Sequence, residues 1–397
     1  MPTHPTFGHL ASEALLRVTV GAVATKGWRV RVLNPEALPV KGPCFLYGNH
    51  SHNLDPFMLG MMMRWGHCPA GVLTQEYLRK GLAARALAGI GLLGTRKRVA
   101  EPHLIRKIYK LLDQGRMLII YPEGGRRWDG RPAPWIESTA KLFARTGVPV
   151  YPVLSHGSYV GWPRWARYPR PARIRLEVLP PLTFERRAPV EETLSRLRPL
   201  IDLDENVVPD LIKPKWAYRP ADGIHRLLYR DPDTGRREAL FSPDGTLVIN
   251  RVGTLRYRML PDSTLLDEQT GALHLTGDLY AQIRALPLEP DPKGRLLHND
   301  VELHLETQFP TLTPYGPVTA TLFEDAVFLQ GTGFSERLRL DSILFTGIER
   351  NYKLQLFQKD RMLQLSFTRS GSALQWDNAF QQLLPAGIAS SSQSSTV

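Results

Sequence analysis

The sequence predicts an α/β N-terminal domain, with a mixed, largely parallel sheet flanked by helices, followed by a β-rich second domain with a C-terminal helix. In the first half of the chain, short apolar runs alternate with helical patterns. After about residue 220, short alternating runs are separated by turn sequences such as Asp233-Thr234-Gly235 and Asp244-Gly245. A length of 397 residues also exceeds the usual size of one domain.

These changes in character divide the chain into five segments. We expect an N-terminal amphipathic helix at 1–27, the α/β domain at 28–212, a linker at 213–220, the β-rich domain at 221–385 and a disordered tail at 386–397. The tail is too small and polar to bury a core.

The N-terminal helix covers roughly residues 6–25. Its apolar side chains recur at helical spacing: Phe7, Leu10, Ala11, Ala14, Leu15, Val18 and Ala22. Glu13 and Arg17 are expected off this face. The apolar face can either pack on its own domain or lie in a bilayer interface.

The α/β domain follows from apolar runs of strand length, which are typical of strands buried on both faces. The expected strands are Trp28–Leu33, Cys44–Tyr47, Met117–Tyr121 and Val148–Leu154. The expected helices are Pro56–Met63, with Asp55 as a suitable cap, Gln75–Leu87, His103–Gln114 and Val190–Leu203.

The β-rich domain follows from short alternating runs. They are Ala239–Ser242, Thr246–Arg251, Leu255–Leu260, Val301–Leu305, Val327–Gln330, Lys353–Phe357 and Met362–Thr368. A closing helix is expected at Ser372–Leu384, with an apolar stripe that includes Trp376 and Phe380.

Charge and composition narrow the classes of function. The net charge of +12 favours a polyanionic partner. No zinc-finger, basic-zipper or RNA-platform pattern accompanies it, so we expect an anionic membrane surface and no nucleic acid. The two cysteines, Cys44 and Cys68, are typical of free thiols in a reducing compartment. Without a secretory signal or about 18 uninterrupted apolar residues, we expect a protein kept inside the cell.

The first candidate catalytic pair follows the expected strand Cys44–Tyr47. His50 and Asp55 stand five positions apart (55 minus 50) in one loop. Near neutral pH an alcohol needs a general base to become a nucleophile, and a carboxylate can orient the histidine that serves as one. Alternatively, Asp55 is only a helix cap. His50, Glu123 and His156 each follow an expected strand, at the edge where open α/β sheets bind ligands.

A second candidate segment, Glu123-Gly124-Gly125-Arg126-Arg127, follows the strand Met117–Tyr121. Two glycines let the backbone approach a ligand closely, and an arginine can bind a phosphate in bidentate fashion. The alternative is a turn with solvated arginines. Thr95-Arg96-Lys97-Arg98 is a third candidate phosphate site, or a basic surface turn.

From Trp28 to Leu182 the chain resembles the glycerolipid acyltransferase family, which includes the lysophosphatidic acid (1-acylglycerol-3-phosphate) acyltransferases. The resemblance is carried by four segments in the family's order. They are Asn49-His50 with Asp55, Gly91 to Arg96, Tyr121-Pro122-Glu123-Gly124-Gly125-Arg126, and Val148-Pro149-Val150-Tyr151-Pro152-Val153.

The resemblance implies an O-acyltransferase of phospholipid biosynthesis, peripheral on the cytoplasmic face of the membrane. It would move a fatty acyl group from acyl-CoA or acyl-carrier protein, as co-substrate, to the hydroxyl of a lysophospholipid, with no other cofactor and no metal. His50 would be the base and Asp55 its orienting acid. Glu123, Gly124 and Arg126 would hold the acceptor, and Arg96 would contact its phosphate. Further possible site residues are Asn49, His52, Arg98, Gly125 and Arg127.

Several positions depart from the family pattern. His52 replaces the usual serine or threonine and is a possible rival base. Gly125 and Arg127 replace threonine and serine, which leaves other acceptors open, such as a glycolipid or an amino-acid lipid. The second segment is one residue short, so Arg96 and Arg98 are ambiguous in register. The end of the β-rich domain faintly resembles a pleckstrin-homology-like fold, which would make this mainly a lipid-binding protein.

Overall fold

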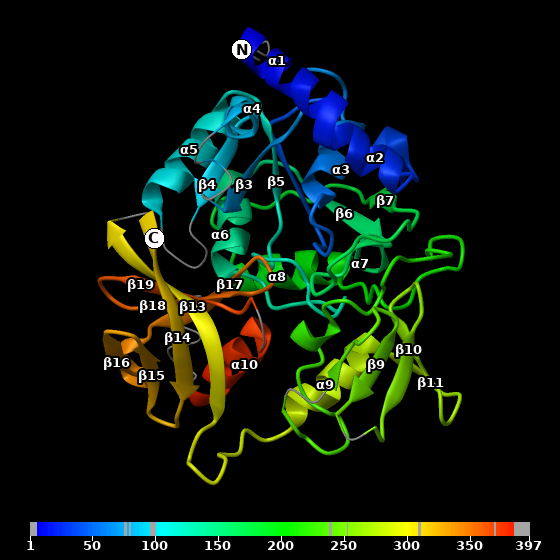
Figure 1. The fold of residues 1–397 in the computed structure, drawn as a ribbon. Helices are drawn as coiled ribbons and strands as arrows, with labels where there is room; N and C mark the ends of the chain where they lie inside the picture. Colours follow the sequence, from blue (N-terminus) through cyan, green and yellow to red (C-terminus); the bar gives the residue numbers. More distant parts are fainter. Residues whose placement is uncertain are drawn as a thin grey trace. The chain divides into compact units, whose positions relative to one another are not determined.

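The computed structural model describes residues 6–74, 78, 81–95, 101–237, 240–251, 253–308, 311–368 and 371–384. The chain divides into two compact units (Figure 1). The first contains the chain up to Arg164 together with Pro169–Tyr218. The second contains Trp165–Tyr168 and the chain from Arg219 onward.

The first unit is built on a seven-stranded sheet with the order β1-β7-β6-β2-β5-β3-β4. The strands are β1 Arg31–Val32, β2 Cys44–Gly48, β3 Ala70–Thr74, β4 Leu92–Thr95, β5 Met117–Ile120, β6 Val150–His156 and β7 Arg175–Val178. Every pair is parallel except β6 with β7. The predicted mixed, largely parallel sheet is confirmed.

Helices cover both faces of this sheet, as the side chains of β2 show. Cys44 and Leu46 join a core with α2 (Ala22–Gly27), α3 (Asp55–Met62) and α7 (Ser158–Gly161). Phe45 and Tyr47, on the other face, join a core with α5 (Pro102–Asp113), α6 (Glu137–Thr146) and α8 (Val190–Leu197). Burial on both sides explains why these strands are apolar without alternation.

The N-terminal helix differs from its prediction. It consists of α1 (Phe7–Leu16), a π-helical turn at Arg17–Gly21 and α2. Phe7 is 88% exposed and Val18 74%, whereas Glu13 is fully buried. Arg17 pairs with Glu13 and also donates to the carbonyls of Met61 and Met63 at the end of α3. Placing Glu13 off the packed face was wrong, because the ion pair with Arg17 allows its carboxylate to be buried.

Two other expected helices begin or end elsewhere. The helix expected at Gln75–Leu87 lies at α4 (Leu82–Gly89), and residues 75–77 are outside the described residues. β3 ends at Thr74, just before them. The helix expected at Val190–Leu203 ends at Leu197 and continues as a 3₁₀ turn to Ile201, because Pro199 cannot supply a helical N–H.

The second unit contains two antiparallel sheets. The first has the order β12-β11-β10-β9-β8, with β8 Leu240–Phe241, β9 Leu247–Asn250, β10 Arg256–Met259, β11 Thr264–Asp267 and β12 Leu273–Leu275, followed by α9 Thr276–Ala285. The second has the order β16-β15-β14-β13-β19-β18-β17. Its strands are β13 Leu297–Gln308, β14 Thr311–Leu322, β15 Ala326–Gly331, β16 Phe334–Arg339, β17 Phe345–Glu349, β18 Lys353–Phe357 and β19 Met362–Ser366.

The chain of this unit closes with α10 (Ala373–Leu383), which begins at the N-cap Ser372 and buries Trp376 and Phe380 completely. The β-rich domain with a C-terminal helix is confirmed, and the pleckstrin-homology-like resemblance stays a prediction. Among the residues that the structure describes, no helix combines the length and apolar character needed to cross a bilayer.

Candidate active site

The two loops that carry the predicted catalytic residues leave the same edge of the first sheet. β2 and β5 are parallel neighbours, with Tyr47 paired to Ile120 at their carboxyl ends. The loop after β2 holds His50, and the loop after β5 begins at Tyr121. The backbone N–H of Arg127 donates to the carbonyl of His50 across 2.7 Å. The sheet therefore brings the two segments into direct contact.

His50 and Asp55 form a hydrogen-bonded pair. The Nδ1 atom of His50 lies 3.0 Å from Oδ2 of Asp55. The imidazole stacks on the ring of Tyr121, with 4.2 Å between the ring centroids and 21° between the planes. Its side chain is 17% exposed. When Nδ1–H donates to the carboxylate, Nε2 is the ring nitrogen that can accept a proton from another molecule.

Asp55 is buried and accepts four hydrogen bonds. Its Oδ2 also accepts from the backbone N–H groups of Ser51, at 3.0 Å, and His52, at 2.8 Å. Its Oδ1 accepts from the hydroxyl of Ser158 at 2.6 Å. Burial raises the pKa of Asp55, but the hydrogen bond from His50 and the other favourable contacts outweigh it, so the pKa is lowered and the carboxylate stays charged. Leu54, and not Asp55, is the N-cap of α3.

His52 is enclosed, unlike His50. Its ring lies 4.3 Å from that of Trp28 and 5.6 Å from that of Trp162. The residue is fully buried, and Nδ1 accepts the backbone N–H of Leu54 at 3.0 Å. Burial lowers the pKa of His52 to about 4. The charge of Asp55 opposes this shift, whereas the charges of Arg126 and His50 add to it. His50 is therefore the imidazole of the two that a substrate can contact.

Asn49 and Gly48 fix the start of the first loop. The side-chain amide of Asn49 exchanges two hydrogen bonds with the backbone of Ser155 on β6, at 2.9 Å and 2.8 Å. At Gly48, a Cβ atom would lie 2.2 Å from the carbonyl oxygen of Val153, so only glycine fits. Both residues tie the loop to the neighbouring strand.

Glu123 lies beneath the second loop, in an ion pair with Arg127. The Nη2 atom of Arg127 is 2.5 Å from Oε1 of Glu123, and the two side chains are 0% and 1% exposed. Arg127 also donates to the carbonyls of Leu203, at 2.7 Å, and Ile201, at 3.0 Å. Burial raises the pKa of Glu123 against the opposing effect of Arg127. The role of Glu123 in holding an acceptor stays a prediction.

Gly124, Gly125 and Arg126 form the turn above this pair. Gly124 has φ +67°, and a Cβ atom there would lie 2.3 Å from the side chain of Ile136. Arg164 is stacked over the ring of Trp128 at 4.3 Å and donates to the carbonyl of Arg126 at 2.8 Å. The Nη1 atom of Arg164 is 3.6 Å from where a Cβ of Gly125 would stand.

Arg126 is half-buried. Burial is the main cause of the lowered pKa of His52, and the charge of Arg126 contributes to it.

Three other predicted residues remain, Arg96, Arg98 and His156. Arg96 and Arg98 fall outside the described residues. His156 is the last residue of β6, and its Nε2 pairs with Glu177 at 3.0 Å.

The structure adds two residues that no sequence motif indicated. Ser158, at the start of α7, supplies the hydroxyl bound to Asp55. Glu205 accepts from the hydroxyl of Ser51 at 2.6 Å, although 154 positions separate the two residues. Ser158 stands only two positions after His156, and Glu205 lies beyond all the candidate segments, but the tertiary contacts alone connect the two residues with the site.

Three comparisons bear on the family. Residues 29–156 match the family model described as Acyltransferase. The mouse (Mus musculus) 1-acyl-sn-glycerol-3-phosphate acyltransferase alpha is 30% identical over 165 residues, which cover 40% of this chain and 56% of that protein. The Pseudomonas aeruginosa 1-acyl-sn-glycerol-3-phosphate acyltransferase is 26% identical over 193 residues, which cover 44% of this chain and 72% of that protein. The chain thus spans little more than half of the mouse protein.

A crystal structure of the 1-acyl-sn-glycerophosphate acyltransferase PlsC from Thermotoga maritima overlaps 48% of this chain and 78% of its own, with a TM-score of 0.42 and 19% identity. The matched region of this chain holds both site loops, from Asn49 to Arg127. The N-terminal part of this chain is therefore similar in sequence to the Acyltransferase family model and to 1-acyl-sn-glycerol-3-phosphate acyltransferases.

Proposed function

We propose that this protein is an O-acyltransferase of phospholipid biosynthesis. It would transfer a fatty acyl group from acyl-CoA or acyl-carrier protein to the free hydroxyl of a lysophospholipid such as lysophosphatidic acid. The observation that carries the proposal is the partly exposed His50, bound at 3.0 Å to the buried carboxylate of Asp55. The names of the relatives support a 1-acylglycerol-3-phosphate as acceptor.

In the proposed reaction, Nε2 of His50 removes the proton from the acceptor hydroxyl. The oxygen then attacks the carbonyl carbon of the acyl thioester. The tetrahedral intermediate collapses as the carbon–sulfur bond breaks, and the imidazolium returns its proton to the departing thiolate. Asp55 stabilises the imidazolium and fixes the tautomer, because its Oδ2 faces Nδ1. The nucleophile comes from the acceptor, so no serine or cysteine of the chain need be acylated.

Arg126 is the candidate cation for the phosphate of the acceptor, since its charge acts on His52, the residue next to the proposed catalytic pair in the first loop. Arg127, in contrast, is turned inward onto Glu123. A panel of lysophosphatidic acid, neutral lysophospholipids, glycolipids and amino-acid lipids, offered with one acyl-CoA, tests this preference. We expect the phosphomonoester to be favoured in wild type and to lose most of its advantage in Arg126→Gln. A wild-type preference for a neutral acceptor would redirect the proposal to another lipid.

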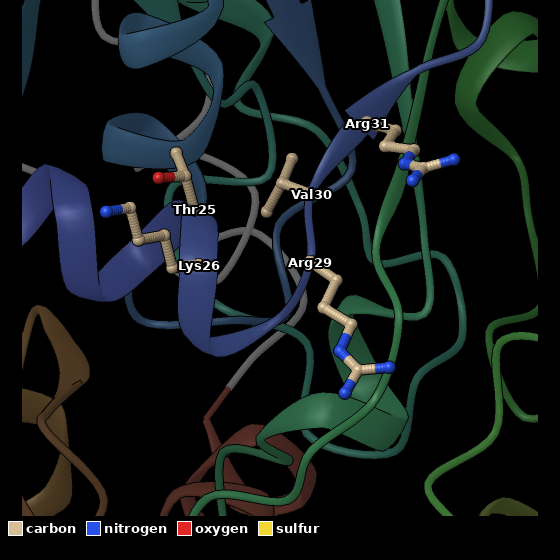
Figure 2. A pocket seen from close by; sticks show the side chains of 5 residues that line it. All are labelled: Thr25, Lys26, Arg29, Val30 and Arg31. Atoms are coloured by element: carbon tan, nitrogen blue, oxygen red, sulfur yellow. The ribbon is translucent and has the colours of Figure 1, made fainter.

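We propose that the protein acts on its lipid acceptor while attached peripherally on the cytoplasmic face of the membrane, and the N-terminal surface supports attachment to a membrane. Phe7, Val18 and Val23 are exposed apolar side chains of this helix. Beyond them, an open cavity of about 440 Å³ is lined by Thr25, Lys26, Arg29, Val30 and Arg31. Figure 2 shows the charged ends of Lys26, Arg29 and Arg31 spread in different directions, an arrangement that suits a surface of many anionic headgroups.

Sedimentation with vesicles tests this attachment. Vesicles of phosphatidylcholine with phosphatidylglycerol should bring down the wild-type protein, and pure phosphatidylcholine should bring down less. Val18→Asp with Val23→Asp should weaken binding, whereas Leu211→Asp, at another exposed apolar side chain (62% exposed), should not. Equal binding by all three proteins would reject this surface.

The activity itself is tested with the purified 397-residue chain, acyl-CoA and lysophosphatidic acid. Release of free thiol and formation of the diacyl product by mass spectrometry should be equimolar. His50→Ala should lower kcat by about a thousandfold or more, because it removes the base. A folded His50→Ala protein with most of its activity would overturn the mechanism. Vesicle binding without thiol release, for every acceptor and donor tried, would favour a mainly lipid-binding protein.

A further inference from the structure

A buried carboxylate from a third segment, Glu205, lies behind the loop that carries His50. Its Oε1 accepts the hydroxyl of Ser51 at 2.6 Å. The backbone N–H of the same serine donates to Asp55 at 3.0 Å. The residue that follows the base is therefore held by Asp55 through its backbone and by Glu205 through its side chain.

The same segment also holds the second loop. Arg127 places Nη1 at 3.6 Å from Oε1 of Glu205, and its guanidinium donates to the carbonyls of Ile201 and Leu203. Through its backbone N–H, Arg127 in turn donates to the carbonyl of His50. Residues 201–205 are thus connected with His50 by two hydrogen-bonded routes, one through Ser51 and one through Arg127.

Glu205 is itself firmly placed. Its Oε2 accepts the backbone N–H of Tyr159 at 3.0 Å, and its own N–H donates to the carbonyl of Gly130 at 2.9 Å. The side chain of Asn206, the next residue, donates to the carbonyl of Asp129 at 2.7 Å. This segment lies beyond residues 29–156, which match the family model.

We propose that Glu205 is a positioning residue for the acyl transfer described above: it sets His50 in line with the second loop, and it does so without touching substrate. The inference rests on the proposed function for its kinetic test. The role belongs to a charged group, because Arg127 is shared between two buried carboxylates, Glu123 and Glu205.

Arg127 favours the charged form of Glu205 and so offsets part of the cost of burying this carboxylate. Burial raises the pKa of Glu205 to about 7, aided by the charge of Asp55 and opposed by Arg127 and by hydrogen bonds from Ser51 and Asn49. Glu205 therefore gains or loses its charge near neutral pH, where the enzyme would work.

Kinetics of Glu205→Gln, Glu205→Ala and Ser51→Ala test the proposal. We expect kcat to fall about tenfold in Glu205→Gln and about a hundredfold in Glu205→Ala, with KM changed by about twofold or less, because misplacement of the base affects the chemical step. The pH profile of kcat should lose an ionisation near pH 7 in Glu205→Gln. Ser51→Ala should lose less than Glu205→Ala.

Glu13→Gln is the matched control. Glu13 is also fully buried and paired with an arginine, 2.7 Å from Nη2 of Arg17, but it contacts neither site loop in the described structure. This variant should lose stability while keeping the kcat and the pH profile of the wild-type protein. If it changes them as Glu205→Gln does, the effect is general destabilisation and the proposal fails.

A spectroscopic readout separates this inference from the proposed activity. Histidine-labelled protein should show a downfield Nδ1–H resonance from the His50–Asp55 bond, assigned by its loss in His50→Ala. It should persist in Glu13→Gln and shift or broaden in Glu205→Gln and Ser51→Ala. A wild-type protein without acyl transfer would defeat the proposed function, and the resonance would still decide the role of Glu205. The positioning role of Glu205 would be overturned if Glu205→Gln and Ser51→Ala both kept the resonance unchanged and the wild-type kcat.

Discussion

Replacement of Asp55 by asparagine isolates the charge of the site from its shape. Asparagine can keep its oxygen at the position of Oδ2, where three N–H groups converge from His50, Ser51 and His52. Its amide group would then face Ser158, whose hydroxyl can accept as well as donate. The loop should therefore keep its geometry while the carboxylate charge is lost.

The expected magnitude follows from the distance. An imidazolium and a carboxylate 3.0 Å apart attract by about 5 kcal/mol at an effective dielectric constant of about 20. This is an upper bound, because the His50 side chain is 17% exposed to screening water. Since about 1.4 kcal/mol corresponds to tenfold in rate, Asp55→Asn should lower kcat by about 10²- to 10³-fold.

The assay is thiol release from acyl-CoA in the presence of lysophosphatidic acid, with unfolding monitored in parallel. Asp231→Asn in the second unit is a matched control, since Asp231 is buried and accepts two backbone N–H groups and the amide of Asn250. It should cost stability and leave kcat unchanged. A folded Asp55→Asn protein with more than about a third of wild-type kcat would refute the assigned role.

Three further predictions concern residues around this pair. His52→Asn keeps an acceptor for the N–H of Leu54, so kcat should stay within about threefold of the wild-type value. The lost ring contacts with Trp28 and Trp162 should lower stability by about 1–2 kcal/mol. A loss of activity like that of His50→Ala would instead make His52 the base. Arg127→Lys should lower the free energy of unfolding by about 3 kcal/mol in urea titrations, because it leaves Glu123 and Glu205 poorly paired. A decrease of less than about 1 kcal/mol would contradict that pairing. The pKa of Glu205 is about 7 when folded and has its ordinary value of 4.5 when unfolded, so the folded state binds more protons between these values. The contribution of this group to stability therefore falls as the pH rises from 4.5 to 7. The difference in unfolding free energy between the wild-type protein and Glu205→Gln should change across this window, and a constant difference would show that Glu205 does not titrate there.

Local sequence patterns were sufficient to predict the central strands of the first unit. β2, β5 and β6 are short apolar runs because helices cover both sheet faces, so composition alone locates them. The contact between His50 and Asp55 was also predictable, since only a short loop separates the end of β2 from the start of α3.

Other elements depend on contacts that no window of sequence contains. The packed face of α1 is set by the ion pair of Glu13 with Arg17 and by the carbonyls of α3. β14 was not predicted, because Pro314, Gly316 and Pro317 interrupt its pattern. The register shift between Leu303 and His304 leaves Tyr315 of β14 as an extra residue beside them. Glu205 accepts a hydrogen bond from Ser51 although 154 positions separate the two residues.

The support that residues 201–205 give to the two loops has a consequence for hybrid enzymes. A chimaera that exchanges only residues 29–156 with a relative would place the transplanted loops on a foreign scaffold, without the carbonyls of Ile201 and Leu203 that receive Arg127. A crossover after Asn206, which is anchored to Asp129, would carry loops and scaffold together. Exchanges that aim to change the acceptor of this protein should therefore transfer the site loops and the chain through Asn206 together.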